Sequence, residues 1–573
     1  MLVVLISSVI YLARQAIPLR GHDHDDGNFM QLLCLRQEDN ETLSKWMNSA
    51  RYKKFTSWSI QNELLELSAR QVLLKLCDDI RKSGMFSVIV DGTSDITCTE
   101  QESVSVRYVD VDLQPQEVFL GFYKLESTDA ETIKNMICDV LLRCHLPTCL
   151  LRGQSYDGAS NMSGRWNGTQ ALILKIQPLA IYVHCLMHSG NLAMLEAMES
   201  TAMIRDASGY ANELALFSRH STKLSSILKL VQLEHAKATS LLRPLCPTRV
   251  LCRGSALMHI LTYLEEILEV LETYENLSSG DAASKAKELL QVIGNGNFIL
   301  ALKCMLSVIL LLENLNRAVQ CRGVSVSSMI ASMQLTKDTL LSLRCDEKFM
   351  TIFGDTLILC TELDVCAPQM PRQRRPPKRL SGAADQHEWS SSAEYFKVQY
   401  YNFIDTAVAA LQKRYEQDGL KKYVTLENLL RGNVSANFEK TRQVLAGYTD
   451  IDPERLTIQI AMAQQQGWDM SSVNSVADNL RSLDPAIRRM FNEVEHLVRL
   501  LLTVPCSNAE AERSFSALRR LKTYLRNSMN QERLNHLAVM HVHQDRLDIV
   551  DKTMIAKEFV SKCETRQGIF GDF

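Results

Sequence analysis

Two aspartates and one distant glutamate are the residues of this chain best suited to chemistry. Asp91 follows the apolar run Ser87–Val90, and Asp157 follows a second apolar run that begins at Leu150. Glu512 lies far downstream in a segment of helix-forming residues. Three carboxylates on one side of a sheet can hold two divalent cations about 4 Å apart, and such a pair of ions promotes in-line displacement at phosphodiester phosphorus. The three residues therefore predict the catalytic site of a polynucleotidyl transferase.

Five short runs of apolar residues predict the strands that would position these carboxylates. The runs are Ser87–Val90, Ser103–Val111, Val118–Leu125, Leu150–Ser155 and Ala180–His184. Between the third and fourth runs, Thr128 and Glu131 form a capping box that opens a helix to about Arg143. This element order is that of the RNase H-like fold, which is an α/β fold. In that fold Asp91 ends the first strand and Asp157 ends the fourth, and these strands are neighbours in the sheet.

The rest of the chain is expected to be mostly α. Residues 1 to about 75 and about 200 to 360 have helical apolar periodicity. Residues 364–392 break this pattern and are expected to form a disordered linker. The basic run in this linker, residues 372–379, could be a nuclear-localisation signal, a phosphate-binding segment or a solvated loop.

The composition is typical of a soluble globular protein rather than of a dedicated nucleic-acid binder. The net charge is −3 and the pI about 6.5, whereas phosphate neutralisation usually requires a clear basic excess. Any contact with DNA must therefore come from local patches or from a domain that this chain lacks. The 16 cysteines are scattered without a Cys-x-x-Cys pair, which indicates reduced thiols in an intracellular protein.

Several local features are better explained by packing or solvation than by targeting or metal binding. The apolar start, residues 1–13, lacks a basic region and a cleavage site, so we expect a core helix rather than a signal peptide. No segment is expected to span a membrane. The cluster Cys144, His145 and Cys149 closes a predicted helix and has no fourth ligand, which favours packing. The polar run His22–Asp26 is expected to be a solvated loop.

The C-terminal segment has more apolar residues than one short pair of helices needs. Two helices are expected here, Phe491–Val504 and Asn508–Leu525, with Ser507 as N-cap of the second. Self-association is a natural use for the apolar excess. The residues predicted for dimerisation are Phe515, Leu518, Leu521, Leu534 and Leu537.

Motifs along nearly the whole chain resemble those of hAT-superfamily (hobo/Activator/Tam3) transposases, especially the domesticated branch with zinc-finger MYM-type protein 1-like proteins. The matching stretches are Leu12–Asp23, Val88–Asp95, Arg152–Gly164, Val183–Leu192 and Val504–Ser516. In this family a long helical insertion interrupts the RNase H-like core. The resemblance therefore implies a helical segment at 1–83, the first part of the core at 84–200, an insertion at 201–480, the returning core helix with the dimerisation region at 481–550, and a tail at 551–573.

The resemblance also assigns roles to individual residues. It implies that Asp91, Asp157 and Glu512 are the catalytic, metal-binding carboxylates. The family's Cys/Asp-x-x-His motif, which assists in handling the DNA end, corresponds to Cys185 and His188. Glu510 would lie well around the helix from Glu512, so only one of the two can face the metals.

Three departures from the family pattern favour loss of transposition. The family's Thr-Arg-Trp motif, whose tryptophan stacks on an unpaired base, reads Thr248-Arg249-Val250 here. Arg249 remains as a DNA-handling residue, but the stacking platform is absent. Gly92 stands where relatives commonly have an acidic residue. The N-terminal zinc-binding domain of active relatives is not expected in this chain, so no structural zinc is expected either, and the chain is expected to begin inside a helix that the family continues upstream.

Three functions remain open on this basis. The first is a domesticated, catalytically inactive nuclear protein that acts as a dimer or larger homo-oligomer, with some association with nucleic acid and none with a membrane. The second is an active DNA transposase that uses Mg²⁺ or Mn²⁺ at Asp91, Asp157 and Glu512. The third is a helical scaffold for protein partners. The departures favour the first function.

Overall fold

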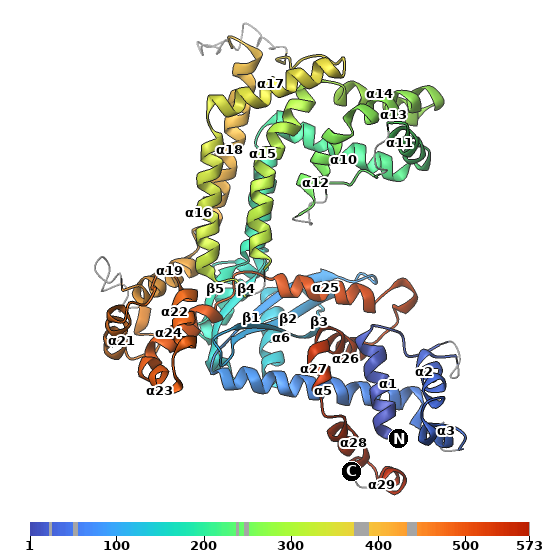
Figure 1. The fold of residues 1–573 in the computed structure, drawn as a ribbon, viewed down its shortest axis with the longest axis vertical. Coiled ribbons are helices and arrows are strands. Elements are labelled where there is room, and N and C mark those ends of the chain that lie inside the picture. The colour runs from blue at the N-terminus through green and yellow to red at the C-terminus, as the bar shows by residue number, and fades with distance from the viewer. Residues whose placement is uncertain are drawn as a thin grey trace. The chain divides into compact units, whose positions relative to one another are not determined.

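The computed structural model describes residues 1–21, 26–49, 55–235, 240–245, 251–321, 323–371, 389–432 and 444–571. Arg249 with Val250, the basic run 372–379 and most of the predicted loop at 22–26 lie outside these residues. The chain divides into two compact units (Figure 1). Unit 1 comprises residues 1–185, 322–327 and 417–573, and unit 2 comprises residues 186–321 and 328–416.

Unit 1 is built on a five-stranded mixed sheet with the strand order β3-β2-β1-β4-β5. The strands are β1 (Phe86–Ser94), β2 (Glu100–Val109), β3 (Pro115–Lys124), β4 (Leu151–Tyr156) and β5 (Ile181–His184). The first three strands pair antiparallel, and β1–β4 and β4–β5 pair parallel. All five predicted strands are therefore present. The predicted α/β core, with its first and fourth strands adjacent in an otherwise mostly helical protein, is confirmed.

Helices cover both faces of this sheet, with α25 and α5 on opposite faces (Figure 1). Those before β5 are α1 (Leu2–Arg14), α2 (Asn28–Gln37), α3 (Glu41–Met47), α5 (Trp58–Ser83), α6 (Ala130–Arg143), α7 (Ser160–Ser163) and α8 (Thr169–Ile176), with a 3-10 turn at Thr148–Leu150. Those of the C-terminal part are α19 (Asp418–Leu430), α21 (Pro453–Gln465), α22 (Val473–Ser482), α23 (Pro485–Arg488), α24 (Asn492–Thr503), α25 (Ala509–Leu521), α26 (Gln531–Val542), α27 (Gln544–Asp548), α28 (Lys552–Ser561) and α29 (Glu564–Phe570), with 3-10 turns at Arg489–Phe491 and Tyr524–Arg526.

The first helix is a core element of unit 1. Leu5, Ile6 and Val9 of α1 are fully buried, and they share one apolar cluster with Val88 and Val90 of β1. Helix α1 packs against α5, α26 and α28. Apolar burial of this kind is the main favourable term in folding, and it accounts for the apolar start of the sequence, as predicted.

Within its described residues, the regular elements of unit 2 are all helices. Its helices are α9 (Leu186–Met198), α10 (Ala202–His220), α11 (Thr222–Glu234), α12 (Arg253–Thr262), α13 (Leu264–Leu277), α14 (Asp281–Ile293), α15 (Gly296–Val319), most of α16 (Val326–Leu343), α17 (Asp346–Glu362) and α18 (Ser392–Tyr415). Helix α15 contacts α9, α10, α12 and α17, and α18 packs along α9. The predicted helical insertion is thus a compact unit of its own.

The boundaries of the insertion and the tail differ from the predicted ones. Unit 2 begins at 186 and ends at 416, instead of 201 and 480, because α19 packs on β5 and both α19 and α21 pack on α24 within unit 1. The predicted tail at 551–573 is also wrong, since Ile555 and Phe559 of α28 are fully buried against unit 1. Helical periodicity identifies an apolar face but does not identify the element that covers it.

Helix α15 has the length and apolarity of a membrane-spanning helix, which no segment of the sequence was expected to reach. It has 24 residues, and an 18-residue window of the helix has a mean hydropathy of 2.1, with 67% of that window buried inside the protein. A helix that is apolar all round is also what the centre of a helical domain requires. The contacts of α15 with five other helices of unit 2, namely α9, α10, α12, α14 and α17, account for its composition.

Candidate functional site

The two predicted aspartates lie at the ends of adjacent parallel strands. Asp91 is near the end of β1, and Asp157 follows the last residue of β4. Ile89 of β1 is in register with Ser155 of β4, which places both aspartates at the same edge of the sheet. Each carboxylate accepts a local backbone N–H: Asp91 Oδ1 from Gly92 at 3.1 Å, and Asp157 Oδ1 from residue 159 at 3.2 Å.

Asp91, Asp157 and Glu512 are close enough to interact electrostatically. Burial raises the pKa of Asp91 well above its usual range, and the negative charges of Asp157, Glu512 and Glu102 raise it further. Glu512 is exposed on α25. Its carboxyl still loses part of its hydration to the surrounding protein, which raises its pKa, although the positive charge of Arg513 lowers it. The fold therefore brings acidic groups from two strands and one helix, far apart in sequence, to one edge.

This donor set suits a hard divalent cation. Carboxylate oxygens are the ligands that Mg²⁺ and Mn²⁺ prefer, and a cation would relieve the repulsion that raises the pKa of Asp91. Within the described residues, the oxygens of Asp91, Asp157 and Glu512 do not all approach one another within 4.8 Å. The assignment of these three residues as metal ligands stays a prediction.

A fourth carboxylate, Glu102, was missed by the sequence reasoning. It lies on β2 directly opposite Gly92 and is 4% exposed. Burial, together with the charges of Asp157 and Glu100, raises its pKa to about 7. A Cβ added at Gly92 would lie 2.8 Å from Glu102 Oε1, so the glycine leaves the space that this carboxylate uses. The first three residues of β2 are polar, so the strand was expected to begin only at Ser103, and Glu102 was assigned to the preceding loop.

Helix α25, which carries Glu512, is tied to the sheet at its N-terminal end by Asn508. The Asn508 side chain accepts a hydrogen bond from Ser155 Oγ at 3.0 Å and donates one to the carbonyl of Val90 at 3.3 Å. The backbone N–H of Asn508 donates to Cys185 Sγ at 3.3 Å. Asn508 thus connects β1, β4 and the end of β5. It also takes the N-cap position predicted for Ser507, without capping through its side chain.

Two further contacts hold α25 along its length. Ser514 and Ser103 of β2 share a buried hydrogen bond of 2.8 Å. Beyond the last turn, Lys522 Nζ lies 2.5 Å from Asp95 Oδ2, and both side chains are buried. Burial opposes ionisation of Asp95, but hydrogen bonds from Lys522 and Thr97 outweigh it and pull the pKa below its usual range. The position of Glu512 is therefore fixed by contacts on both sides of it.

Glu510, the second glutamate of α25, is buried and paired with an arginine. It is 4% exposed and forms an ion pair of 2.7 Å with Arg513. Arg513 also lies 3.5 Å from Glu117, which pairs with the buried Arg107 at 2.8 Å. The two glutamates of α25 have different surroundings: Glu510 pairs with Arg513, whereas the negative charge of Glu512 contributes to the raised pKa of Asp91.

The unit boundary in the sequence falls within the Cys-x-x-His motif. Cys185 is buried as the last residue of unit 1's first segment, whereas His188 belongs to α9 of unit 2. Through its contact with Asn508, Cys185 supports the end of α25 that precedes Glu512. The DNA-handling role of Cys185, His188 and Arg249 stays a prediction.

The residues predicted for dimerisation are buried inside unit 1. Exposures are 7% or less for Phe515, Leu518, Leu521, Leu534 and Leu537. All five belong to the apolar cluster that also contains the strands and α1. The inference of surplus apolar surface from these residues is therefore wrong, because β3, α1 and α5 cover what the pair α25 and α26 leaves open.

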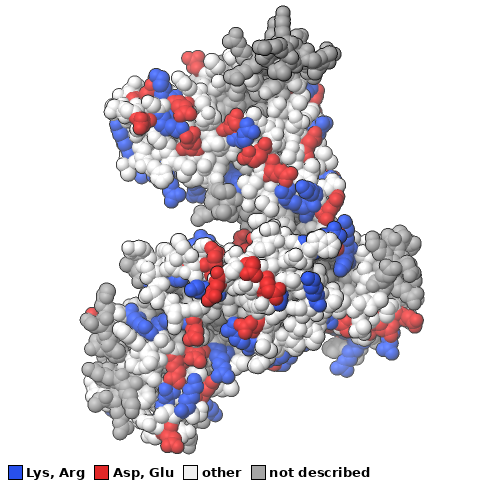
Figure 2. All heavy atoms as spheres, turned by 180° about the vertical axis from the view of Figure 1, so that it is seen from behind, with Lys and Arg blue, Asp and Glu red and all other residues white. Residues whose placement is uncertain are grey.

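The described surface carries charges of both signs. On the face shown in Figure 2, Lys and Arg are interspersed with Asp and Glu in each unit. Such a distribution agrees with the nearly balanced composition. Binding to a polyanion generally requires a patch or stripe of basic residues.

Two regions of the chain match models of known protein families. Residues 1–168 match the family described as "ZMYM1/FAM200, RNase-like domain", and residues 488–545 match the "hAT family C-terminal dimerisation region". The chain is similar to the human protein named "52 kDa repressor of the inhibitor of the protein kinase", with 23% identity over 97% of this chain and 76% of the relative. The mouse protein of the same name is 22% identical over the same shares. The chain thus combines a region that matches a ZMYM1/FAM200-type RNase-like domain with one that matches an hAT dimerisation region, and in this it is similar to hAT-related, transposase-like proteins.

Proposed function

We propose that this protein is a domesticated, transposase-derived nuclear protein that works through self-association and contact with nucleic acid, without catalysing strand transfer. The observation that carries the proposal is the hAT dimerisation region at 488–545, in a chain similar to proteins named as repressors. A repressor needs a stable assembly on its target and does not need to cut DNA. Self-association is therefore the property that we expect the protein to use.

The sequence at Val250 supports the loss of transposition. In the resembled family a tryptophan at this position stacks on a base, and such stacking contributes about 1–3 kcal/mol per base. Valine offers no aromatic surface for this contact. Processing of a DNA end would therefore lose one of its positioning contacts even with the carboxylates in place.

Self-association can be tested by measuring the mass of the full chain by light scattering after gel filtration. We expect at least twice the monomer mass of 64.8 kDa. With Leu518 and Leu537 buried, the interface must use exposed groups of the same region, such as Tyr524, which is 79% exposed. Tyr524→Ser should weaken the assembly, whereas Val111→Ser, 74% exposed on the loop after β2, should not. A monomer at all concentrations would overturn this part of the proposal.

Nuclear targeting can be tested on the run 372–379, which has five basic residues and no acidic one. A fluorescent fusion of the full chain should accumulate in the nucleus. Replacing the five basic residues by glutamine should abolish accumulation, whereas an all-lysine run should preserve it because the charge is kept. Exclusion of the unchanged protein from the nucleus would contradict the proposal.

The second candidate, an active strand-transfer enzyme, is favoured by the convergence of Asp157 and Glu512 on Asp91. In that case these three residues would hold Mg²⁺ or Mn²⁺, and the ions would stabilise charge at the reacting phosphate. Nicking of supercoiled DNA distinguishes the two functions. We expect no metal-dependent nicking above that of Asp91→Asn. Nicking that disappears in Asp91→Asn, Asp157→Asn and Glu512→Gln would establish the enzyme instead.

A further inference from the structure

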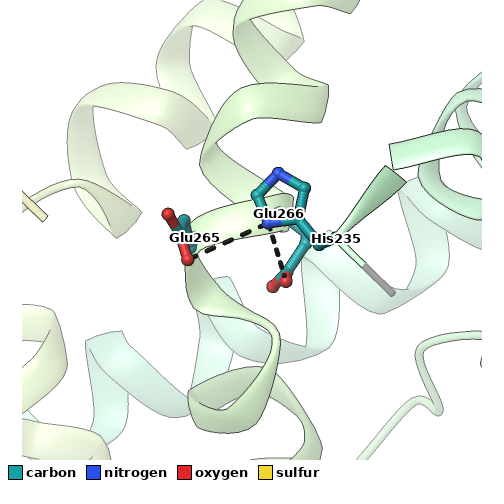
Figure 3. Close-up of side chains that lie close together, drawn as sticks. All are labelled: His235, Glu265 and Glu266. Carbon is teal, nitrogen blue, oxygen red and sulfur yellow. Dashed lines mark ion pairs between the residues drawn. The ribbon is translucent and has the colours of Figure 1, made fainter. Parts of the chain in front are cut away.

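One histidine and two glutamates of unit 2 lie together between α11 and α13. His235 directly follows α11, and Glu265 and Glu266 are in the first turn of α13. His235 Nδ1 is 3.3 Å from Glu266 Oε1 and 4.0 Å from Glu265 Oε2 (Figure 3). We propose that these three side chains bind a first-row divalent cation such as Zn²⁺. The proposal is independent of the function proposed above.

The spacing of the ligand atoms fits such an ion. Zn²⁺ takes ligands at about 2.0–2.2 Å in a tetrahedral arrangement, which separates two ligand atoms by about 3.4 Å. The distance of 3.3 Å from His235 Nδ1 to Glu266 Oε1 is close to this value, and the distance of 4.0 Å to Glu265 Oε2 exceeds it by about 0.6 Å. One ligand atom from each residue lies within 4.8 Å of the others, a property of no other His/Cys/Asp/Glu triple in the described parts of the chain. Water would complete the coordination.

Carboxylates surround the imidazole ring of His235. Glu266 is 0% exposed, Glu265 is close by, and Glu269 approaches the other side of the ring. Imidazole nitrogen and carboxylate oxygen are both ligands that Zn²⁺ takes in proteins.

Glu269 is positioned to accept a hydrogen bond from His235 and so to orient this histidine toward a bound metal. Its Oε2 lies 3.0 Å from His235 Nε2, while Nδ1 faces Glu265 and Glu266. When Nε2–H donates to Glu269, Nδ1 presents its lone pair toward the two glutamates. Metal-bound histidines commonly donate their second N–H to a carboxylate, which fixes the ring and its tautomer. All four residues thus match one arrangement, with one ring nitrogen for the metal and the other for the supporting carboxylate.

The ligand types favour a transition metal over Mg²⁺. Imidazole nitrogen suits Zn²⁺ and its neighbours, whereas Mg²⁺ takes oxygen ligands. The site would join the end of α11 to the start of α13, two helices that already pack on each other. Its role would be to stabilise this part of unit 2. The proposal departs from the expectation that the chain holds no structural zinc.

The test is a calorimetric titration of the full chain with Zn²⁺, performed on an Asp91→Asn background so that the acidic edge of unit 1 is weakened. We expect one ion per chain, not displaced by excess Mg²⁺. Glu266→Gln and His235→Ala should abolish binding, and Glu269→Gln should weaken it about 10–100-fold. Glu272→Gln, an exposed glutamate further along α13, is the matched control and should leave the affinity unchanged.

Cobalt substitution shows which side chains bind the ion. Co²⁺ at this site should give the visible spectrum of a tetrahedral nitrogen–oxygen complex, without the charge-transfer band of thiolate ligands, and the spectrum should be lost in His235→Ala. Circular dichroism of His235→Ala and Glu265→Gln checks that the variants fold. Equal Zn²⁺ affinity in the unchanged protein and folded His235→Ala, a thiolate spectrum, or no binding at all would each overturn the proposal.

Discussion

Lys522 and Asp95 form a buried ion pair of 2.5 Å that joins the end of α25 to the turn after β1. Breaking such a pair leaves one charge uncompensated in the interior, which typically costs about 3–5 kcal/mol. We expect Lys522→Met and Asp95→Asn each to lower the free energy of unfolding by this order. The double variant should lose less than the sum, because neither charge is then left alone. Urea denaturation checks this, with the exposed Arg519→Met as control.

The same pair predicts how unit 1 responds to acid. Because the pKa of Asp95 is lower in the folded chain than its ordinary value, the stabilising effect is fully present above about pH 4. This stabilisation is lost as the pH falls further, because Asp95 is then protonated in the unfolded chain but still ionised in the folded chain. Asp95→Asn should therefore show a weaker loss of stability between pH 4 and pH 2 than the unchanged protein. Equal slopes in both proteins would show that the ion pair does not form in solution.

Glu102 should have the opposite dependence on pH. Its pKa of about 7 exceeds the ordinary value of 4.5, so the folded chain keeps a proton that the unfolded chain loses. Stability should fall as the pH rises from about 4.5 to 7, by up to about 3 kcal/mol, and stay level above that. Glu102→Gln should remove this slope, whereas Glu100→Gln on the same strand should largely keep it. Melting temperatures at pH 5 and pH 8 provide the comparison.

Gly92 and Glu102 should behave as a coupled pair. A methyl group at position 92 would come within 2.8 Å of the Glu102 carboxylate, whose surroundings are buried. We expect Gly92→Ala to destabilise the chain by about 1–3 kcal/mol, the usual cost of overpacking. In the Glu102→Ala background the same substitution should cost much less. A double-mutant cycle measures this coupling, and additive effects would mean that the carboxylate moves aside freely.

The sheet and the approach of Asp91 to Asp157 were predictable because short apolar runs bounded by polar turns specify strands locally. The position of Asn508 was not, since its role depends on Ser155 and Val90, which are hundreds of residues away. Capping signals are equally local. Thr128 and Glu131 suggested a capping box, but Asp129 caps α6 instead, accepting from the Thr132 N–H at 2.9 Å. Residues that act through distant partners require the fold before they can be identified.

Leu537 tests the distinction between core and interface. It is fully buried, and α26 packs on both α5 and β3. Leu537→Ala should therefore create a cavity and cost about 2–5 kcal/mol of stability. The loss should be equal at high and low protein concentration, because the residue contacts its own chain.

An interface residue behaves differently: its replacement lowers the melting temperature only where the protein would otherwise associate, and the difference disappears on dilution. Melting curves over a hundredfold range of concentration, with Tyr524→Ser as the interface variant, separate the two cases. A concentration-dependent effect of Leu537→Ala would instead place α26 in the contact between subunits.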